Sequence, residues 1–163
     1  MDGKHVAIRK PGGSGSLYFN YKKFFSVVLF AMCDANYKFL YCDFGNYGSA
    51  SDGGIFDRSD LNYRMLSGLN LPPPEPLPNT TTSLPYFVFG DCAFPLRCDI
   101  MKPFPVNQGH NTTIFNYRLY LFIPYFYRLA FLFRVFRLSR ARRTIENAFG
   151  LLSARLRFFA WDN

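Results

Sequence analysis

The order of hydrophobic patterns along this chain predicts an α/β domain. Three apolar runs of β type come first, a segment of helical period follows, and a short β run and an amphipathic helix complete the order. A length of 163 residues suits one domain, and an apolar fraction of 49% is enough to build a core. We therefore expect strands and helices to share one core.

The first three elements read as an antiparallel meander. Residues 5–11, "HVAIRKP", alternate apolar and polar positions and run into the turn "GGSGS". Residues 24–34, "FFSVVLFAMCD", form a nearly continuous apolar run of β-formers, which is typical of a buried central strand. Residues 37–45, "YKFLYCDFG", follow after a short turn.

The next segments change in period and composition. Ser51 or Asp52 can cap one helix with an apolar stripe at Ile55, Phe56, Leu61, Met65 and Leu66. Residues 69–85 form a proline-rich connector, for which we expect no regular structure. Residues 86–94, "YFVFGDCAF", predict another short buried strand, which ends at Asp91, and the segment after it reads as a loop.

Residues 138–159 predict an amphipathic helix. Its apolar positions recur every three or four residues, and its other face is basic, with Arg140, Arg143 and Arg155. Before it lies an unusual apolar stretch, residues 119–136, with eight aromatic side chains. Its length fits a short membrane span, but Pro124 and two arginines oppose one, because an arginine near the bilayer centre costs about 2.5–3.5 kcal/mol. We expect no membrane span.

The net charge and the cysteines limit which binding partners and which cellular compartment we expect. A formal charge of +8 favours a polyanionic partner such as nucleic acid, and the alternative is a solvated basic surface. The spacing of the four cysteines, at positions 33, 42, 92 and 98, matches no zinc signature. We expect reduced, mostly buried thiols in an intracellular protein.

Three acidic residues stand where elements begin or end. Asp2 opens the first strand, Asp91 ends a later strand, and Glu146 lies on the last helix. Carboxylates that converge at strand ends make an oxygen-only site suited to Mg²⁺ or Mn²⁺. Each also has a structural alternative: Asp2 a frayed terminal residue, Asp91 a turn residue, and Glu146 a partner for an arginine one turn away.

Several blocks, in order, resemble a known family. "DGKHVAIRKP", "SGSLYFNYKKFFS", "GSASDGGIF", "VFGDCAFPL" and "LSRARRTIENAFG" are similar to the DDE superfamily endonuclease domain of PIF/Harbinger-type transposases and their domesticated nucleases. The resemblance covers residues 2–159, apart from the connector and the apolar stretch. It implies one catalytic domain over residues 1–159 with an RNase H-like fold, a mixed five-stranded sheet flanked by helices.

The resemblance also implies roles for individual residues. Asp2, Asp91 and Glu146 match the catalytic carboxylates, and Asp52 matches a further acidic position associated with metal binding. The structural alternative for Asp52 is a helix N-cap, and the two roles are compatible. Two divalent cations, Mg²⁺ or Mn²⁺, would activate water or a 3′-hydroxyl for attack on a phosphodiester. Basic side chains would hold DNA phosphates near the metals: Lys22, Lys23, Arg140, Arg142 and Arg143.

The chain departs from the family in two places. It begins at the first catalytic aspartate, so we expect a domain truncated at the N-terminus with Asp2 poorly held. Residues 119–137 separate "FNYR" from "LSRARR", which the family joins directly. Removing these 19 residues shortens the separation of Asp91 and Glu146 from 55 positions to 36, which is typical of DDE enzymes, so we interpret them as an insertion.

The expected function is a metal-dependent DNA endonuclease or transposase-like catalytic domain, as a partial fragment. The alternative is a catalytically silent descendant that acts as a DNA- or protein-binding module. Expected partners are DNA and a separate DNA-binding protein, and the expected location is the nucleus, with the cytoplasm as the alternative.

Overall fold

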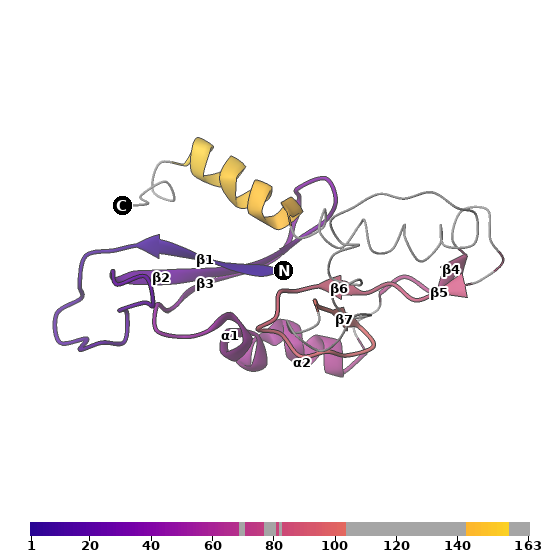
Figure 1. The fold of residues 1–163 in the computed structure, drawn as a ribbon, viewed down its shortest axis with the longest axis horizontal. Helices are drawn as coiled ribbons and strands as arrows, with labels where there is room; N and C mark the ends of the chain where they lie inside the picture. Colours follow the sequence, from indigo (N-terminus) through magenta and orange to yellow (C-terminus); the bar gives the residue numbers. More distant parts are fainter. Residues whose placement is uncertain (69–70, 77–80, 82, 104–142, 157–163) are drawn as a thin grey trace, which may run out of the picture.

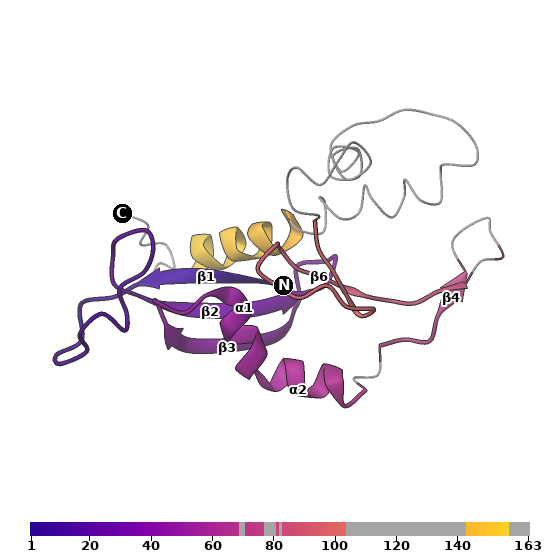
Figure 2. The same ribbon diagram turned by 60° about the horizontal axis from the view of Figure 1, so that its bottom comes forward.

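A computed structural model describes residues 1–68, 71–76, 81, 83–103 and 143–156. Within these ranges a twisted antiparallel sheet lies between two helical layers (Figure 1). The short helices α1 and α2 cover one face, and the helix over residues 143–155 covers the other (Figure 2). The α/β class predicted from the sequence is confirmed.

The sheet is a three-stranded meander in the order β1-β2-β3, as predicted. Its strands are β1 (Asp2–Ala7), β2 (Ser26–Cys33) and β3 (Phe39–Tyr47), and both pairings are antiparallel. β1 begins and ends earlier than the predicted strand over residues 5–11, because its ladder with β2 ends where Ala7 meets Ser26. Beyond that pair the chain turns away into a long loop that contains Pro11, which has no N–H to donate.

β2 carries the core on both of its faces. Val28 and Phe30 join the buried cluster of α1 and α2, while Leu29 and Ala31 pack against the 143–155 helix. On that helix Ile145 is buried, as the predicted apolar stripe requires. Burial on both faces explains why β2 reads as a continuous apolar run rather than an alternating one.

Two helices occupy the segment for which one helix was predicted. α1 (Asp52–Arg58) ends at Ser59, and α2 (Asp60–Leu66) begins there. Ser59 is extended, its hydroxyl donates to the carbonyl oxygen of Phe56 at 2.7 Å, and it accepts from the N–H of Asn62 at 3.1 Å. The prediction of one helix is wrong because a capping serine breaks it while the apolar period continues across the break.

Short strand pairs follow the helices. β4 (Glu75–Pro76) and β5 (Ser83–Leu84) pair antiparallel, so the proline-rich connector is not without regular structure. β6 (Val88–Phe89) and β7 (Ile100–Met101) pair in parallel. β6 is much shorter than the predicted strand and ends before Asp91, and β7 lies in a segment predicted as a loop, because two residues are too few to show a period.

All four cysteines lie in the described ranges, and all four thiols are free, as expected. Their predicted burial is wrong: Cys33 is half-buried and the other three are exposed, on β3 and in the loops after β6. In the described part of the chain no helix is both long and apolar enough to cross a bilayer. The apolar stretch of residues 119–136 and the insertion that contains it lie outside the described residues.

Candidate metal centre

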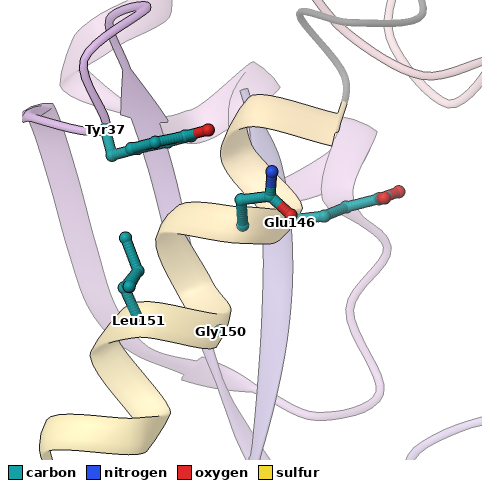
Figure 3. A pocket seen from close by; sticks show the side chains of 5 residues that line it. Tyr37, Glu146, Gly150 and Leu151 are labelled. Carbon is teal, nitrogen blue, oxygen red and sulfur yellow. The ribbon is translucent and has the colours of Figure 1, made fainter.

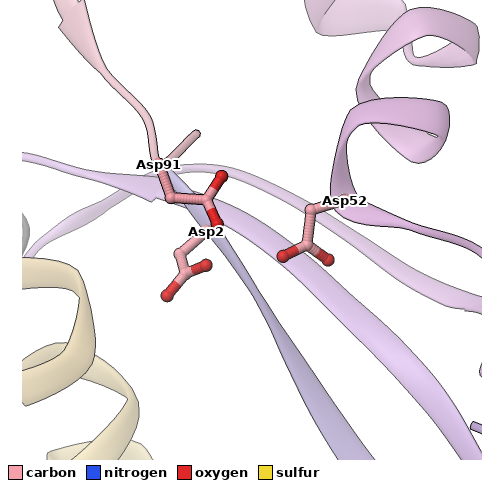
Figure 4. A group of neighbouring side chains, drawn as sticks. All are labelled: Asp2, Asp52 and Asp91. Carbon is pink, nitrogen blue, oxygen red and sulfur yellow. The ribbon is translucent and has the colours of Figure 1, made fainter. Parts of the chain in front are cut away.

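Three aspartates from three different elements meet at one end of the sheet. Asp2, Asp52 and Asp91 each offer a carboxylate oxygen, and these oxygens lie within 4.8 Å of one another. Figure 4 shows the three side chains gathered where the start of β1, the start of α1 and the loop after β6 come together. All three are partly buried. The structure therefore brings together three of the four carboxylates predicted from the sequence.

Asp2 is held by the sheet. It pairs with Ala31 across the β1–β2 ladder, and its Oδ1 accepts a hydrogen bond from the N–H of Gly3 at 3.0 Å. The preceding Met1 is buried in the core, and its nitrogen donates to the carbonyl oxygen of Phe89 at 2.6 Å. The expectation that Asp2 is frayed or poorly held is therefore wrong, because ladder pairing and a buried neighbour fix this end of β1.

Asp52 reaches the cluster through a space that a glycine leaves open. A Cβ atom placed on Gly3 would lie 2.1 Å from Asp52 Oδ1, so a side chain at this position would exclude the carboxylate. Likewise a Cβ atom on Gly53 would lie 2.4 Å from the carbonyl oxygen of Ala93, in the loop that carries Asp91. Two close backbone approaches therefore bring the three elements together.

The helix cap leaves the Asp52 carboxylate available. Ser51 is the N-cap of α1, and its side chain accepts from the N–H of Gly54 at 3.2 Å. Asp52 is the first residue of the helix. Of the two caps that the sequence allowed, the structure uses the serine, so Asp52 is not needed for capping.

Asp91 is fixed by a tight turn and a buried aromatic anchor. Its Oδ1 accepts from the N–H of Ala93 at 2.8 Å. Phe94, in the same loop, is fully buried; its ring stacks on that of Phe30 at a centroid distance of 5.9 Å and meets that of Phe56 edge-on at 5.7 Å. Asp91 is thus both the turn residue of the structural alternative and a member of the cluster.

The electrostatics of the cluster fit a cation. Burial, followed by the negative charges of Asp2 and Asp91, raises the pKa of Asp52 from its usual 3.8 to about 6, while the N–H of Gly3 acts in the opposite direction. Crowded carboxylates of this kind repel one another, and a hard divalent cation relieves the repulsion. An oxygen-only donor set suits Mg²⁺ or Mn²⁺.

Glu146 is not a member of this group. It is exposed near the start of the 143–155 helix, where it lines a shallow pocket with Tyr37, Asn147, Gly150 and Leu151 (Figure 3). Its neighbour Ile145 packs in the same cluster as Ala31, the cross-strand partner of Asp2. Glu146 therefore lies on the helix that covers the Asp2 face of β1, and its catalytic role stays a prediction.

The basic candidates fall into two places. Lys22 and Lys23 are exposed in the loop that follows β1, at the opposite end of that strand from Asp2. This position differs from the expectation that they lie near the metals. Arg143 is exposed at the start of the described helix, and Arg140 and Arg142 lie outside the described residues.

Sequence reasoning missed Gly3 and Gly53. Their signal is the dipeptide Asp-Gly, which occurs at both Asp2 and Asp52. Asp-Gly is also a common turn signal, so only the close contacts of Gly3 with Asp52 and of Gly53 with Ala93 reveal its use here.

Comparisons with known proteins agree with this geometry. A family model described as "DDE superfamily endonuclease" matches residues 1–120, which include all three clustered aspartates and end before Glu146. No curated protein and no solved structure matches the chain. The matched segment is well over half of the sequence, and the chain belongs to the DDE superfamily of endonucleases.

Proposed function

We propose that this chain is a metal-dependent DNA endonuclease of transposase type. The observation that carries the proposal is the group of three carboxylate oxygens within 4.8 Å, supplied by Asp2, Asp52 and Asp91. Membership in the DDE superfamily implies a DNA substrate. The order of the sequence blocks supports the finer assignment to the PIF/Harbinger type, and a DNA substrate supports a nuclear location.

The proposed site would act by holding divalent cations at a fixed position through its carboxylates. Bound Mg²⁺ or Mn²⁺ would supply Lewis acidity toward water or a 3′-hydroxyl and toward the leaving oxygen of a phosphodiester. Asp2 and Asp91, held by main-chain hydrogen bonds, would provide ligands of fixed geometry. Asp52 would add its carboxylate after losing the proton that its raised pKa retains below about pH 6.

We further propose that Glu146 completes the acidic set. The support is its place on a helix packed against the same face of the sheet as Ala31, which pairs with Asp2. Arg143, exposed one turn before it, would hold a DNA phosphate, together with Arg140 and Arg142.

We also propose that β6 and β7 extend the sheet to the RNase H-like order β3-β2-β1-β6-β7. The hydrogen bond from the Met1 nitrogen to the Phe89 carbonyl oxygen supports this order, because it joins the start of β1 to β6. The parallel pairing of β6 with β7 agrees with it.

Nicking of supercoiled plasmid DNA tests the proposal. The wild-type chain is expected to nick in Mg²⁺ or Mn²⁺ and to be inactive in EDTA. Asp91→Asn is expected to lower the rate at least about a hundredfold, because it removes a ligand charge. The matched control is Asp57→Asn, on the exposed side of α1, which is expected to leave the rate unchanged.

One outcome would count against the mechanism, and another against the role of Glu146 alone. Nicking that persists in Asp91→Asn would exclude the carboxylate cluster as the active site. If Glu146→Gln retained full activity while Asp91→Asn lost it, the three aspartates would suffice and the role of Glu146 would be rejected.

A further inference from the structure

A second feature of the molecule is a cationic loop far from the carboxylates. The basic loop, residues 8–25, connects β1 to β2. It exposes Arg9, Lys10, Lys22 and Lys23, and no acidic residue occurs in the sequence between Asp2 and Asp34. Of the ion pairs recorded between described residues, Arg64 with Asp60 and Arg97 with Asp99, neither involves a cation of this loop.

Side-chain hydrogen bonds fix the basic loop to the sheet. Asn20 is only 3% exposed, and its Oδ1 accepts from the N–H groups of Lys22 at 2.9 Å and Phe24 at 3.3 Å. Its Nδ2 donates to the hydroxyl of Ser26, a fully buried residue at the start of β2. That hydroxyl also lies 2.9 Å from Nδ1 of His5 on β1. Buried Asn20 and Ser26, together with half-buried His5, therefore tie the loop to both strands.

A turn at residues 20–24 of the loop presents two lysines beside an aromatic ring. Tyr21 is 79% exposed, its ring meets that of His5 edge-on at 5.5 Å, and Lys22 Nζ lies 5.9 Å from its centroid. Lys23 has a φ of 68°, a conformation in which glycine or asparagine is usually found. A lysine held there at a cost in backbone strain, with its charge in solvent, fits a role that depends on the side chain.

The position of the loop relative to the carboxylates determines which part of a bound DNA duplex it can contact. It follows the last residue of β1, whereas Asp2 is the first, and Figures 1 and 2 show the two at opposite ends of the strand. Six residues at about 3.3 Å each place the loop about 20 Å from the carboxylates. Along duplex DNA, at about 3.4 Å per base pair, that distance is about six base pairs.

We propose that the basic loop binds backbone phosphates of duplex DNA about six base pairs to one side of the cleaved bond. This inference rests on the proposed function, because it takes the carboxylates as the point of cleavage. The loop would position the duplex without reading its sequence, since its charged groups are three lysines and an arginine, exposed in the loop, that would meet backbone phosphates.

Salt-dependent binding tests the inference separately from cleavage. Affinity for a 30-base-pair duplex would be measured by fluorescence anisotropy in EDTA at several salt concentrations. The double variant Lys22→Gln/Lys23→Asn removes both charges and keeps a residue that tolerates the φ of position 23. It is expected to raise Kd about tenfold near 0.1 M salt and to reduce the salt slope by about 1.8.

The matched control removes two positive charges at a different place, on the layer formed by α1 and α2. Arg58→Ala/Arg64→Ala, on α1 and α2, is expected to leave Kd within about twofold, because these residues lie on the face covered by the short helices. Circular dichroism and the melting midpoint would establish that both double variants are folded. Equal losses in the two double variants would overturn the inference, because the effect would then follow net charge alone.

The remaining outcomes separate this inference from the proposed function. An unchanged Kd in the loop variant, with plasmid nicking intact, would overturn the loop assignment and leave the nuclease standing. Loop-dependent DNA binding by a chain that does not nick would overturn the nuclease and support the loop. If the loop variant lost binding only to phosphatidylserine vesicles and not to DNA, a membrane surface would replace DNA as the partner.

Discussion

At the scale of single residues, the side chain that Gly3 lacks determines how closely α1 can approach β1. The Asp52 carboxylate occupies the place where a Cβ atom at this position would lie. A residue with no functional group therefore sets the spacing of the ionisable groups in the cluster.

Gly3→Ala should therefore weaken metal binding without removing a ligand. The added methyl group would displace Asp52, and we expect affinity for Mn²⁺ to fall about 10- to 100-fold, as measured by isothermal titration calorimetry. The control is Gly150→Ala, on the 143–155 helix, where nothing lies within 4 Å of the added carbon. It should leave the affinity unchanged and stabilise the helix by up to about 1 kcal/mol. Wild-type affinity in Gly3→Ala would contradict the packing argument.

The raised pKa of Asp52 gives a pH dependence with a definite sign. Between about pH 4 and pH 6 the folded chain retains a proton on Asp52 that the unfolded chain has released. This group therefore makes stability fall as pH rises through that window, and its unfavourable contribution is constant above it. Asp52→Asn should abolish this component and make the metal-free protein more stable than wild type at pH 7.

Urea unfolding in EDTA at several pH values between 4 and 7.5 would measure this difference. The difference between wild type and variant isolates Asp52 from other groups, including His5. Burial, and then the charge of Lys22, lowers the pKa of His5 from its ordinary value of 6.5. The stability that neutral His5 contributes is therefore lost as the pH falls below 6.5. A difference that does not vary with pH would show that Asp52 titrates normally in the fold.

The candidate site could be predicted from the sequence only in part. Asp2, Asp52 and Asp91 were identified because they stand in family-like blocks and at element boundaries. The roles of Gly3 and Gly53 could not be predicted, because a close contact between a helix and a strand leaves no local pattern. Glu146 remains a prediction, because its helix begins after residues that lie outside the described ranges.

At the scale of elements, Ser59 divides the segment after β3 into two helices. It caps α2 through Asn62 and closes α1 through the carbonyl oxygen of Phe56. Helical period alone could not reveal the division, since Ile55, Leu61 and Met65 all reach the same core. The break lets α1 keep its own direction, with Asp52 at its start.

Ser59→Ala should destabilise the fold by about 1 kcal/mol, within a range of about 0.5–2, because it removes an N-cap acceptor. Urea unfolding followed by circular dichroism would measure the change. Ser16→Ala, at an exposed position in the basic loop, is the control and should change stability by less than about 0.5 kcal/mol. Equal effects of the two substitutions would argue against a special role for Ser59.

Long strands were more predictable than short ones. The sequence predicts every end of β2 and β3 to within two residues, because eight or nine positions are enough to display burial on one or both faces. β6 and β7 have two residues each, and their pairing depends on contacts between distant parts of the chain. A local pattern cannot encode such a pairing.

At the scale of the whole molecule, negatively and positively charged side chains lie at opposite ends of β1. Three carboxylates lie at the start of β1, and exposed cations lie beyond its end. The two helical layers on β2 fix both ends relative to each other, because β2 is the strand that both buried clusters share. An extended ligand of negative charge would therefore meet attraction from the loop and would need cations at the carboxylates.

Deleting residues 119–137 tests whether this segment belongs to the working protein. The deletion restores the family-like separation of 36 positions between Asp91 and Glu146, so we expect metal-dependent nicking at or above the rate of the full chain. Plasmid nicking and circular dichroism would be compared for the two proteins. A folded deletion variant that no longer nicks would show that the segment is required.

The loop and the carboxylates lie at the two ends of β1, so the length of this strand fixes the distance between them. In the proposed complex with DNA, its length would set how far the phosphate bound by the loop lies from the bond to be cut. Alternate residues of a strand face opposite layers, so inserting one residue would turn the following side chains to the wrong face. The distance between the loop and the carboxylates can therefore change only in steps of two residues, about 6.6 Å or about two base pairs of DNA.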